Sequence, residues 1–419
     1  MGKNKDKSNN YNKTAIDQLF TKHSPEFLQD KKINSNNMKN CIFKETENED
    51  EFQEGKRPML SIGMTVYNQE RYVAKAIESI LMQRVNFDYE IVIAEDCSTD
   101  SSREIVIKYA KKYPRLIKLI LQEHNVGLKE QSICLKKTCR GIYRTQLEGD
   151  DFLLSPDKLQ MQVDFLESHP EYVAVSGRIK CANPSDKICA FPYGSLTSIY
   201  CFSGEYTLEH FQKWLLPSHT SALLYRNIFY KCETDFLDKY ESYDVMGDRK
   251  TALLLLSIGK ILVMPIDVSV RRIDLQSPAN FTGNSVQIKP YATICAWMNR
   301  LEEMAMDMFG ISVNFQLEKR KQWVYSLTNF ARSPSKNSLN SVKNVYRLSS
   351  EKDEYRAIFR SKLKAKIKSK IKKEGYLHGF INIARSAIKT FGKFIKSKEI
   401  SMEALRKSEN IISSSAVRK

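Results

Sequence analysis

The chain has 419 residues, which is enough for one large domain or two domains of ordinary size. Apolar residues make up 42% of it, a share typical of a globular protein and too high for a largely disordered one. The 9 cysteines include no Cys-x-x-Cys pair, so neither a zinc site nor a disulfide framework is expected, and such thiols suit a reducing cytoplasm. We find neither a secretory signal nor a spanning segment, so we expect a soluble or peripheral protein.

The net charge of +17 is concentrated at one end of the chain. Residues 343–419 hold 21 Lys and Arg against 7 Asp and Glu, which accounts for +14 of the total. The preceding residues are close to neutral. The basic tail therefore needs an explanation separate from that of the rest of the protein.

Residues 1–57 are polar and are expected to be disordered or loosely helical. From Pro58 onwards, apolar runs typical of buried strands alternate with amphipathic segments typical of helices. We expect strands at 59–66, 89–94, 117–121, 143–147 and 172–176, and helices at 70–83, 102–112, 129–139 and 155–168. In the last helix Ser155 is the expected N-cap and Pro156 the first helical residue. This alternation predicts an α/β fold with a parallel sheet and crossover helices.

Beyond residue 177 the pattern is mixed. A helix ends at Gly259 and a strand follows it, and further helices are expected at 291–308 and 317–330. The chain contains neither GxGxxG nor GxxxxGK[ST], which argues against an ordinary dinucleotide enzyme or a P-loop NTPase.

Polar residues gather after three of the predicted strands, at 65–70, 95–100 and 148–151. Because ligands of open α/β sheets bind beyond the carboxyl ends of the strands, these clusters are expected to share one edge. Adjacent carboxylates such as Asp150 and Asp151 repel each other unless a positive charge neutralises them, and Mg²⁺ does this while also binding substrate phosphates. The pair thus indicates a metal–diphosphate site, although a solvated turn before the next helix has the same composition.

In segments 61–70, 94–100 and 147–152, with Asn125, Val126 and Gly127 between them, the sequence resembles the family 2 glycosyltransferases. The resemblance covers about residues 58–180 and continues more weakly to about 275. It implies the GT-A fold, a Rossmann-like, mostly parallel sheet flanked by helices. The implied domain at 58–275 has a nucleotide-binding half at 58–177 and an acceptor half at 178–275, and it is followed by a helical region at 276–342 and the basic tail at 343–419.

The resemblance also implies roles for individual residues near the nucleotide. Thr65, Tyr67 and Glu70 would border the base and ribose, and Asp96 would accept a hydrogen bond from the uracil or ribose. The alternatives are a packing aromatic for Tyr67, a first-turn partner of the helix dipole for Glu70 and an N-cap of the helix that follows for Asp96. Asp151 would bind a divalent metal, Mg²⁺ or Mn²⁺, directly. Asp150 would contact the metal, the ribose or a metal-bound water.

On the acceptor side, Asp248 resembles the carboxylate that deprotonates the acceptor in this family. A helix N-terminal Asp is the alternative for it, and Asp244 is the nearest rival base. His219 would line the acceptor side of the site, unless it is a buried structural histidine. Two departures from the family pattern concern Glu148, where many relatives have Asp, and Arg271-Arg272, where relatives often have an Arg–His pair near the donor phosphates.

The function implied is that of an inverting glycosyltransferase. It would move a sugar from a nucleotide-diphospho-sugar to an acceptor hydroxyl in the synthesis of a cell-surface polysaccharide or glycolipid. A UDP-sugar is the expected donor. Two other classes stay open: a non-catalytic scaffold at a membrane surface that keeps the fold, and a nucleotidyltransferase, which uses a related sheet and metal site.

The basic tail has the pattern of a membrane-binding segment. Residues 356–373 contain nine Lys and Arg and no acid, while apolar residues recur every four positions at Phe359, Leu363, Ile367 and Ile371. A cationic helix with such a stripe is suited to an anionic lipid surface, which predicts a peripheral membrane protein. The resemblance to family 2 glycosyltransferases implies a cytoplasmic position on the inner face of the cell membrane, with glycan or lipid-linked acceptors. A solvated charged helix is the alternative. Nucleic acid is disfavoured because the aromatic residues lie in the apolar stripe.

Overall fold

A computed structural model describes residues 57–190, 199–200, 203–274, 291–332 and 336–349. The chain divides into two compact units, 1–349 and 350–419. All described residues belong to the first unit. The expected polar segment before Arg57 and almost all of the basic tail, including its apolar stripe, lie outside the described residues.

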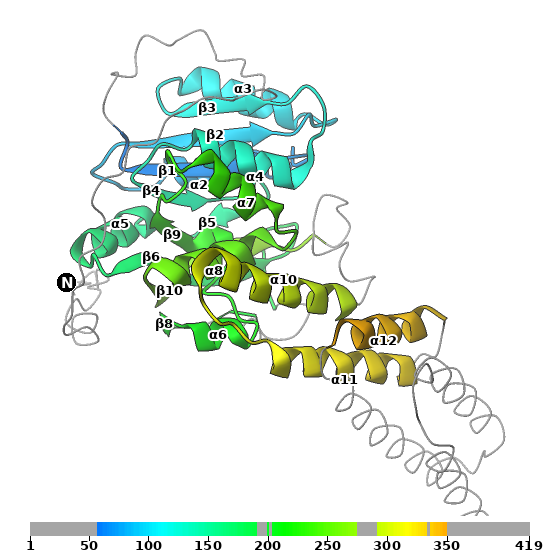
Figure 1. Ribbon diagram of the computed structural model, residues 1–419. Helices are drawn as coiled ribbons and strands as arrows, with labels where there is room; N and C mark the ends of the chain where they lie inside the picture. Colours follow the sequence, from blue (N-terminus) through cyan, green and yellow to red (C-terminus); the bar gives the residue numbers. More distant parts are fainter. Residues whose placement is uncertain (1–56, 191–198, 201–202, 275–290, 333–335, 350–419) are drawn as a thin grey trace, which may run out of the picture. The chain divides into compact units, whose positions relative to one another are not determined.

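A single sheet of ten strands forms the centre of the first unit (Figure 1). Its strands are β1 (Leu60–Val66), β2 (Tyr89–Glu95), β3 (Ile117–Leu121), β4 (Tyr143–Gln146), β5 (Phe152–Leu153), β6 (Tyr172–Ala182), β7 (Ile188–Cys189), β8 (Gly204–Tyr206), β9 (Leu223–Arg226) and β10 (Lys260–Arg272). Eight of them follow the order β3-β2-β1-β4-β9-β6-β10-β5, with β7 paired to β6 and β8 to β10. Six of these eight run in one direction, and β9 and β5 run against it. The predicted α/β class with a mostly parallel sheet is therefore confirmed.

The described helices include all of the predicted ones, most with shifted ends, and three that were not predicted individually, at 208–212, 234–242 and 336–348. The helices are α2 (Val73–Leu81), α3 (Ser102–Lys112), α4 (Gly127–Thr138), α5 (Lys158–Ser168), α6 (Leu208–Gln212), α7 (Thr234–Ser242), α8 (Gly247–Ile258), α10 (Tyr291–Phe309), α11 (Gln316–Arg332) and α12 (Lys336–Leu348), with a 3₁₀ turn η2 (Thr220–Ala222). The predicted start of α5 is wrong, because Asp157 and not Ser155 holds the N-cap position. The Ser155 hydroxyl accepts the Asp157 N–H at 3.3 Å and so forms a turn ahead of the helix.

Two features of the sheet were not predicted. β9 comes from the later part of the chain, yet it lies between β4 and β6 and is antiparallel to both. β10 continues for 13 residues through Pro265, where the register with β6 shifts between Val263 and Asp267. A proline lacks the N–H that a sheet ladder needs, so an irregularity is where a long strand tolerates one.

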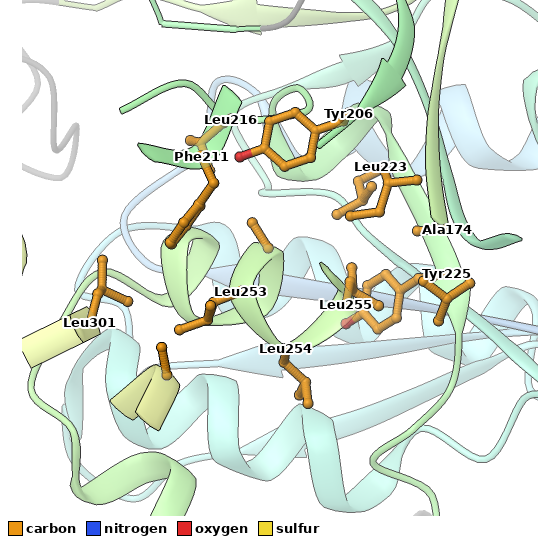
Figure 2. Close-up of a cluster of buried hydrophobic side chains, with 14 of the residues drawn as sticks. Ala174, Tyr206, Phe211, Leu216, Leu223, Tyr225, Leu253, Leu254, Leu255 and Leu301 are labelled. Carbon is orange, nitrogen blue, oxygen red and sulfur yellow. The ribbon is translucent and has the colours of Figure 1, made fainter. Parts of the chain in front are cut away.

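The apolar core fixes the helix that carries the predicted base. Leu253, Leu254 and Leu255 of α8 are buried in one cluster with Tyr225 of β9 and Leu301 of α10 (Figure 2). Burying one leucine side chain contributes about 1.5–3 kcal/mol, so this cluster holds α8 firmly against the sheet. Within the described part of the chain, no helix combines the length and the apolar character needed to cross a membrane.

Candidate functional site

The three polar clusters meet at one edge of the sheet, as the sequence predicted. β1 lies between β2 and β4 and is parallel to both. Beyond the paired residues, the Asp96 N–H donates to the Val66 carbonyl at 2.9 Å and the Gly149 N–H to the Thr65 carbonyl at 3.0 Å. The loops after all three strands are thereby joined by main-chain hydrogen bonds.

Two of these loops are also joined by side chains. The carboxylate of Glu70 accepts the Ser101 N–H at 3.0 Å, and Asp100 accepts the Glu70 N–H at the same distance. Asn68 has a positive φ of 51° and accepts the Thr99 N–H at 2.9 Å. Glu70 therefore lies near the N-terminus of α3 and ahead of α2, not in the first turn of its own helix as the dipole alternative required, while Tyr67 is half-buried in the same loop.

Asp96 has a structural partner already. Its two carboxylate oxygens accept the N–H groups of Val126 at 2.8 Å and Gly127 at 2.9 Å, at the start of α4. The predicted alternative, an N-cap of the helix that follows Asp96, is wrong, because Ser101 holds that position in α3 and the N–H groups that Asp96 accepts belong to the start of α4. Because each carboxylate oxygen can accept more than one hydrogen bond, these contacts do not use up the acceptor capacity needed for the predicted nucleotide contact.

Glu148, Asp151 and His219 form a group of three with the composition of a metal site. One ligand atom from each lies within 4.8 Å of the others. Glu148 and Asp151 follow β4, whereas His219 immediately precedes η2 and is carried there by the antiparallel strand β9. The sequence predicted Asp151 as a ligand and left the role of Glu148 open. It placed His219 on the acceptor side, and the carboxyl group of Asp150 lies outside this group of three.

Hydrogen bonds fix the two carboxylates of this group. The Thr220 hydroxyl contacts both oxygens of Glu148, at 2.8 and 3.0 Å. Asp151 is 2% exposed, and its Oδ1 accepts the Arg272 N–H at 2.9 Å. Its Oδ2 is buried, accepts no hydrogen bond from any described residue and lies 3.4 Å from Nδ1 of His219. Thr220 was not predicted, although it lies next to His219 in a loop that the sequence did single out.

Burial and neighbouring charges shift the pKa values of this group and of Asp150. Burial raises the pKa of Asp151 well above its usual value, and the charges of Asp150 and Glu148 raise it further. Burial also raises the pKa of Glu148 and of Asp150. Burial and the nearby Arg271 lower the pKa of His219 well below its usual value, so its imidazole is neutral and able to bind a metal.

A divalent cation fits these residues. The unsatisfied Oδ2 of Asp151 needs a positively charged or hydrogen-bonding partner, and carboxylate oxygens with a neutral imidazole are ordinary ligands of such ions. A bound cation would also favour the ionised form of the crowded carboxylates.

The loop after β1 and the metal group approach each other closely at Gly149. A Cβ atom at this position would lie 2.4 Å from Oε1 of Gln69 and 3.1 Å from Cγ2 of Val66. A larger residue at this position would displace the end of the Gln69 side chain and press against Val66. Oε1 of Gln69 is itself buried and accepts no hydrogen bond from the described residues.

Asp248 lies in the first turn of α8 and is half-buried. Its charge acts on Tyr200, whose pKa burial raises to about 12, and the charge of Arg271 acts on the same phenol with the opposite sign. Arg271 in turn is influenced by Asp151 and Glu148, which help to hold its pKa above the usual value against the effect of burial. Tyr200 and Arg271 thus connect the predicted base electrostatically with the metal group.

Comparison with known proteins agrees with this arrangement. Residues 61–231 match the model of Glycosyl transferase family 2. The putative glycosyltransferase EpsE of Bacillus subtilis is 38% identical over 118 residues, which cover 28% of this chain and 42% of EpsE. Residues 61–231 form a family 2 glycosyltransferase domain.

One more curated relative and one solved structure are similar to parts of the chain. Chondroitin synthase of Escherichia coli is 34% identical to the chain over 107 residues, 26% of this chain and 15% of the synthase. A crystal structure of S. aureus TarS in complex with UDP-GlcNAc has a TM-score of 0.45 and 18% identity, covering 73% of this chain and 92% of that one. The chain spans less than half the length of the curated relatives it matches.

The family predicted from the sequence is thus confirmed, and the sheet agrees with the GT-A fold expected of it. The glycosyltransferase domain includes the predicted nucleotide loop and the group of Glu148, Asp151 and His219. Asp248 and Arg271 lie beyond the matched residues.

Proposed function

We propose that this protein is an inverting glycosyltransferase that moves a sugar from a nucleotide-diphospho-sugar, a UDP-sugar, to an acceptor hydroxyl. The observation that carries the proposal is the unsatisfied Oδ2 of Asp151 beside Glu148 and His219, inside a family 2 domain. The likeness to chondroitin synthase supports a role in the synthesis of a cell-surface polysaccharide or glycolipid.

Asp151, Glu148 and His219 would hold the divalent ion, Mg²⁺ or Mn²⁺. Such an ion, when bound, stabilises the charge that develops on the departing nucleoside diphosphate. Arg271 lies close enough to Asp151 and Glu148 to be influenced by their charges, and its guanidinium would add positive charge on the same side. The departure from the Arg–His pair of relatives would then be tolerated, because His219 supplies an imidazole from the loop before η2.

The nucleotide would lie across the joined loops after β1 and β2. Thr65, Tyr67 and Glu70 would border the base and ribose, Asp96 would accept a hydrogen bond from the uracil, and Asp150 would contact the ribose. Since these loops are held together by hydrogen bonds before any ligand binds, they would lose little conformational freedom on binding.

Asp248 would act as the general base. Its carboxylate would take the proton of the acceptor hydroxyl as that oxygen attacks the anomeric carbon from the face opposite the diphosphate, which inverts the configuration. Positioning both substrates at one edge of the sheet would supply much of the remaining acceleration.

Measurement of nucleotide binding and sugar transfer on matched variants tests this function. We expect UDP to raise the melting temperature more than other nucleoside diphosphates, and to do so only with Mn²⁺ or Mg²⁺ present. Asp248→Asn should keep this shift but lower kcat by about 10²–10⁴-fold. The matched control is Asp244→Asn, an exposed neighbour, which should transfer sugar normally.

Three results would contradict the proposal. Near-normal turnover in Asp248→Asn would exclude Asp248 as the base. Nucleotide binding without sugar transfer from any nucleotide-sugar would favour a non-catalytic scaffold, and release of pyrophosphate from a nucleoside triphosphate would favour a nucleotidyltransferase.

A further inference from the structure

Arg272 is hydrogen-bonded to Asp151 of the metal group and to its neighbour Asp150. Its guanidinium is buried and donates from Nη1 to the carbonyl of Asp150, while its main-chain N–H donates to Oδ1 of Asp151 at 2.9 Å. The guanidinium carbon lies 4.3 Å from the ring centre of Tyr72 and 5.2 Å from that of Phe152. Arg272 therefore contacts Asp150 and Asp151 through hydrogen bonds, and its guanidinium lies close to two aromatic rings.

The turn between β6 and β7 supplies a carboxylate to this arginine. Oδ1 of Asp186 accepts from Nε of Arg272 at 2.9 Å and from Nη2 at 2.6 Å. Its Oδ2 accepts from Nζ of Lys75, on α2, at 2.8 Å. Asp186 has a positive φ of 61°, and Oδ1 of Asn183 accepts the N–H groups on both sides of it in the chain, which fixes the turn.

The direction of the Arg272 side chain matters for a cation at the site. Asp150 and Asp151 are far from Arg272 in the sequence but are hydrogen-bonded to it, and a buried guanidinium is attracted to any nearby carboxylate. An arginine that turned towards Asp151 or Glu148 would neutralise the charge that a divalent ion needs. Asp186 accepts hydrogen bonds from Nε and Nη2 of Arg272 and so keeps the guanidinium in the direction in which Nη1 donates to the Asp150 carbonyl.

We propose that Asp186 is a positioning residue of the metal site, which acts by orienting Arg272 so that Arg272 holds the Asp150–Asp151 segment open to a divalent cation. The inference rests on the proposed function, because it takes Asp151 as a metal ligand. It assigns Arg272 to the support of the metal group and leaves contact with the donor phosphates to Arg271.

A titration of the full chain with Mn²⁺, followed by electron paramagnetic resonance, tests the role of Asp186 without reference to turnover. Loss of a residue that supports metal ligands typically weakens metal binding by about 10–100-fold, so Asp186→Ala should raise the Kd for Mn²⁺ by at least about tenfold. An Mn²⁺ Kd of Asp186→Ala equal to that of the wild-type protein overturns the inference.

Asp267→Ala is the matched control. Asp267 is also paired with two cations, Arg178 at 3.2 Å and Lys180 at 3.5 Å, and its side chain is 29% exposed against 35% for Asp186. It lies on the same strand as Arg272, and among the described residues its ion pairs go to Arg178 and Lys180 and to no member of the metal group. We expect its Mn²⁺ Kd to stay within about twofold of the wild-type value, and equal weakening in the two variants overturns the inference.

A gentler variant guards against loss of the fold. Asp186→Asn keeps the size of the side chain and one oxygen acceptor but removes the charge, so it should fold and weaken Mn²⁺ binding less than Asp186→Ala does. An unchanged Kd in Asp186→Asn together with a misfolded Asp186→Ala overturns the inference. Wild-type protein that binds no Mn²⁺ overturns the proposed metal site itself, which distinguishes the two failures.

Discussion

Lys158 is a buried ammonium group that the proposed mechanism does not use. It is 0% exposed, and its Nζ lies 3.4 Å from the hydroxyl of Thr145, which already donates to the carbonyl of Leu223 at 2.7 Å. Burial lowers the pKa of Lys158 to about 7. Because the unfolded chain holds this proton more tightly, folding at neutral pH must either bury a charge or release a proton.

We expect Lys158→Met to raise the free energy of unfolding at pH 7, by about 1–4 kcal/mol, since it replaces a poorly satisfied cation with an apolar side chain of similar length. The sign of the pH dependence follows from the lowered pKa. Between pH 7 and about 10 the unfolded state binds more protons, so the wild-type protein gains stability as pH rises, by up to ~1.4 kcal/mol per pH unit.

Urea unfolding of both proteins at pH 7.5 and 9.5 measures this effect. The advantage of Lys158→Met should shrink at the higher pH. A constant difference between the two proteins, or a less stable variant at both values, would contradict the interpretation of Lys158 as a strained buried cation.

The residues of the site were predictable where they follow parallel strands. Asp96 and Asp151 come shortly after two predicted strands, and the carboxyl ends of parallel strands share an edge, so their position at that edge follows from the pattern. The position of His219 beside Asp151 does not follow from the pattern. It depends on β9, an antiparallel strand that lies between β4 and β6. Asp186 carries no local signal at all, since an Asp in a turn is common and its partner Arg272 is 86 residues away.

At the scale of elements, three helices are joined by a buried ionic cluster. Glu241 of α7 accepts from Lys136 of α4 at 2.8 Å and from Lys250 of α8 at 2.5 Å. Burial opposes the ionisation of Glu241, but the two lysines more than offset it and hold its pKa below the usual value. Lys250 is two residues from Asp248, so the cluster ties the start of α8 to the nucleotide-binding part of the sheet.

Glu241→Gln should therefore destabilise the protein by about 3–5 kcal/mol, because it leaves two buried ammonium groups without their shared counter-charge. The matched control is Glu209→Gln, which removes a carboxylate from the exposed pair with Lys213 and should leave the melting temperature unchanged. Thermal unfolding by circular dichroism compares the two variants. Equal melting temperatures would mean that the cluster contributes no stability.

The elements themselves could be predicted when they were long or strongly periodic. The strands at 117–121 and the helix at 102–112 have the expected bounds, since each combines a clear period with a turn at both ends. β9 has four residues and β5 two, which is too short for any period to appear. Their places in the sheet are set by pairing with strands distant in the sequence, so the sequence beyond residue 177 shows only a mixed pattern.

At the scale of the whole molecule, the sequence joins a nearly neutral body to a strongly basic end. The site described above lies entirely within the first unit, 1–349, whereas most of the excess positive charge belongs to the second, 350–419. A polymer- or lipid-modifying enzyme needs its acceptor held near the site. We propose that the second unit supplies this by binding an anionic membrane surface on the cytoplasmic side, with a lipid-linked glycan as acceptor.

Sedimentation with vesicles tests this division of roles. The full chain should bind vesicles that contain anionic phosphatidylserine and not vesicles of neutral phosphatidylcholine, since each Lys or Arg near a charged surface contributes about 1 kcal/mol. Raising the salt should weaken the binding, because the attraction is screened within about 10 Å at 0.1 M. A chain ending at Ser349 should stay in solution while keeping the melting-temperature shift with UDP and Mn²⁺, which also serves as the control for its fold. Equal sedimentation of the full and shortened chains would assign membrane binding elsewhere or exclude it, and would leave the basic end as a solvated segment.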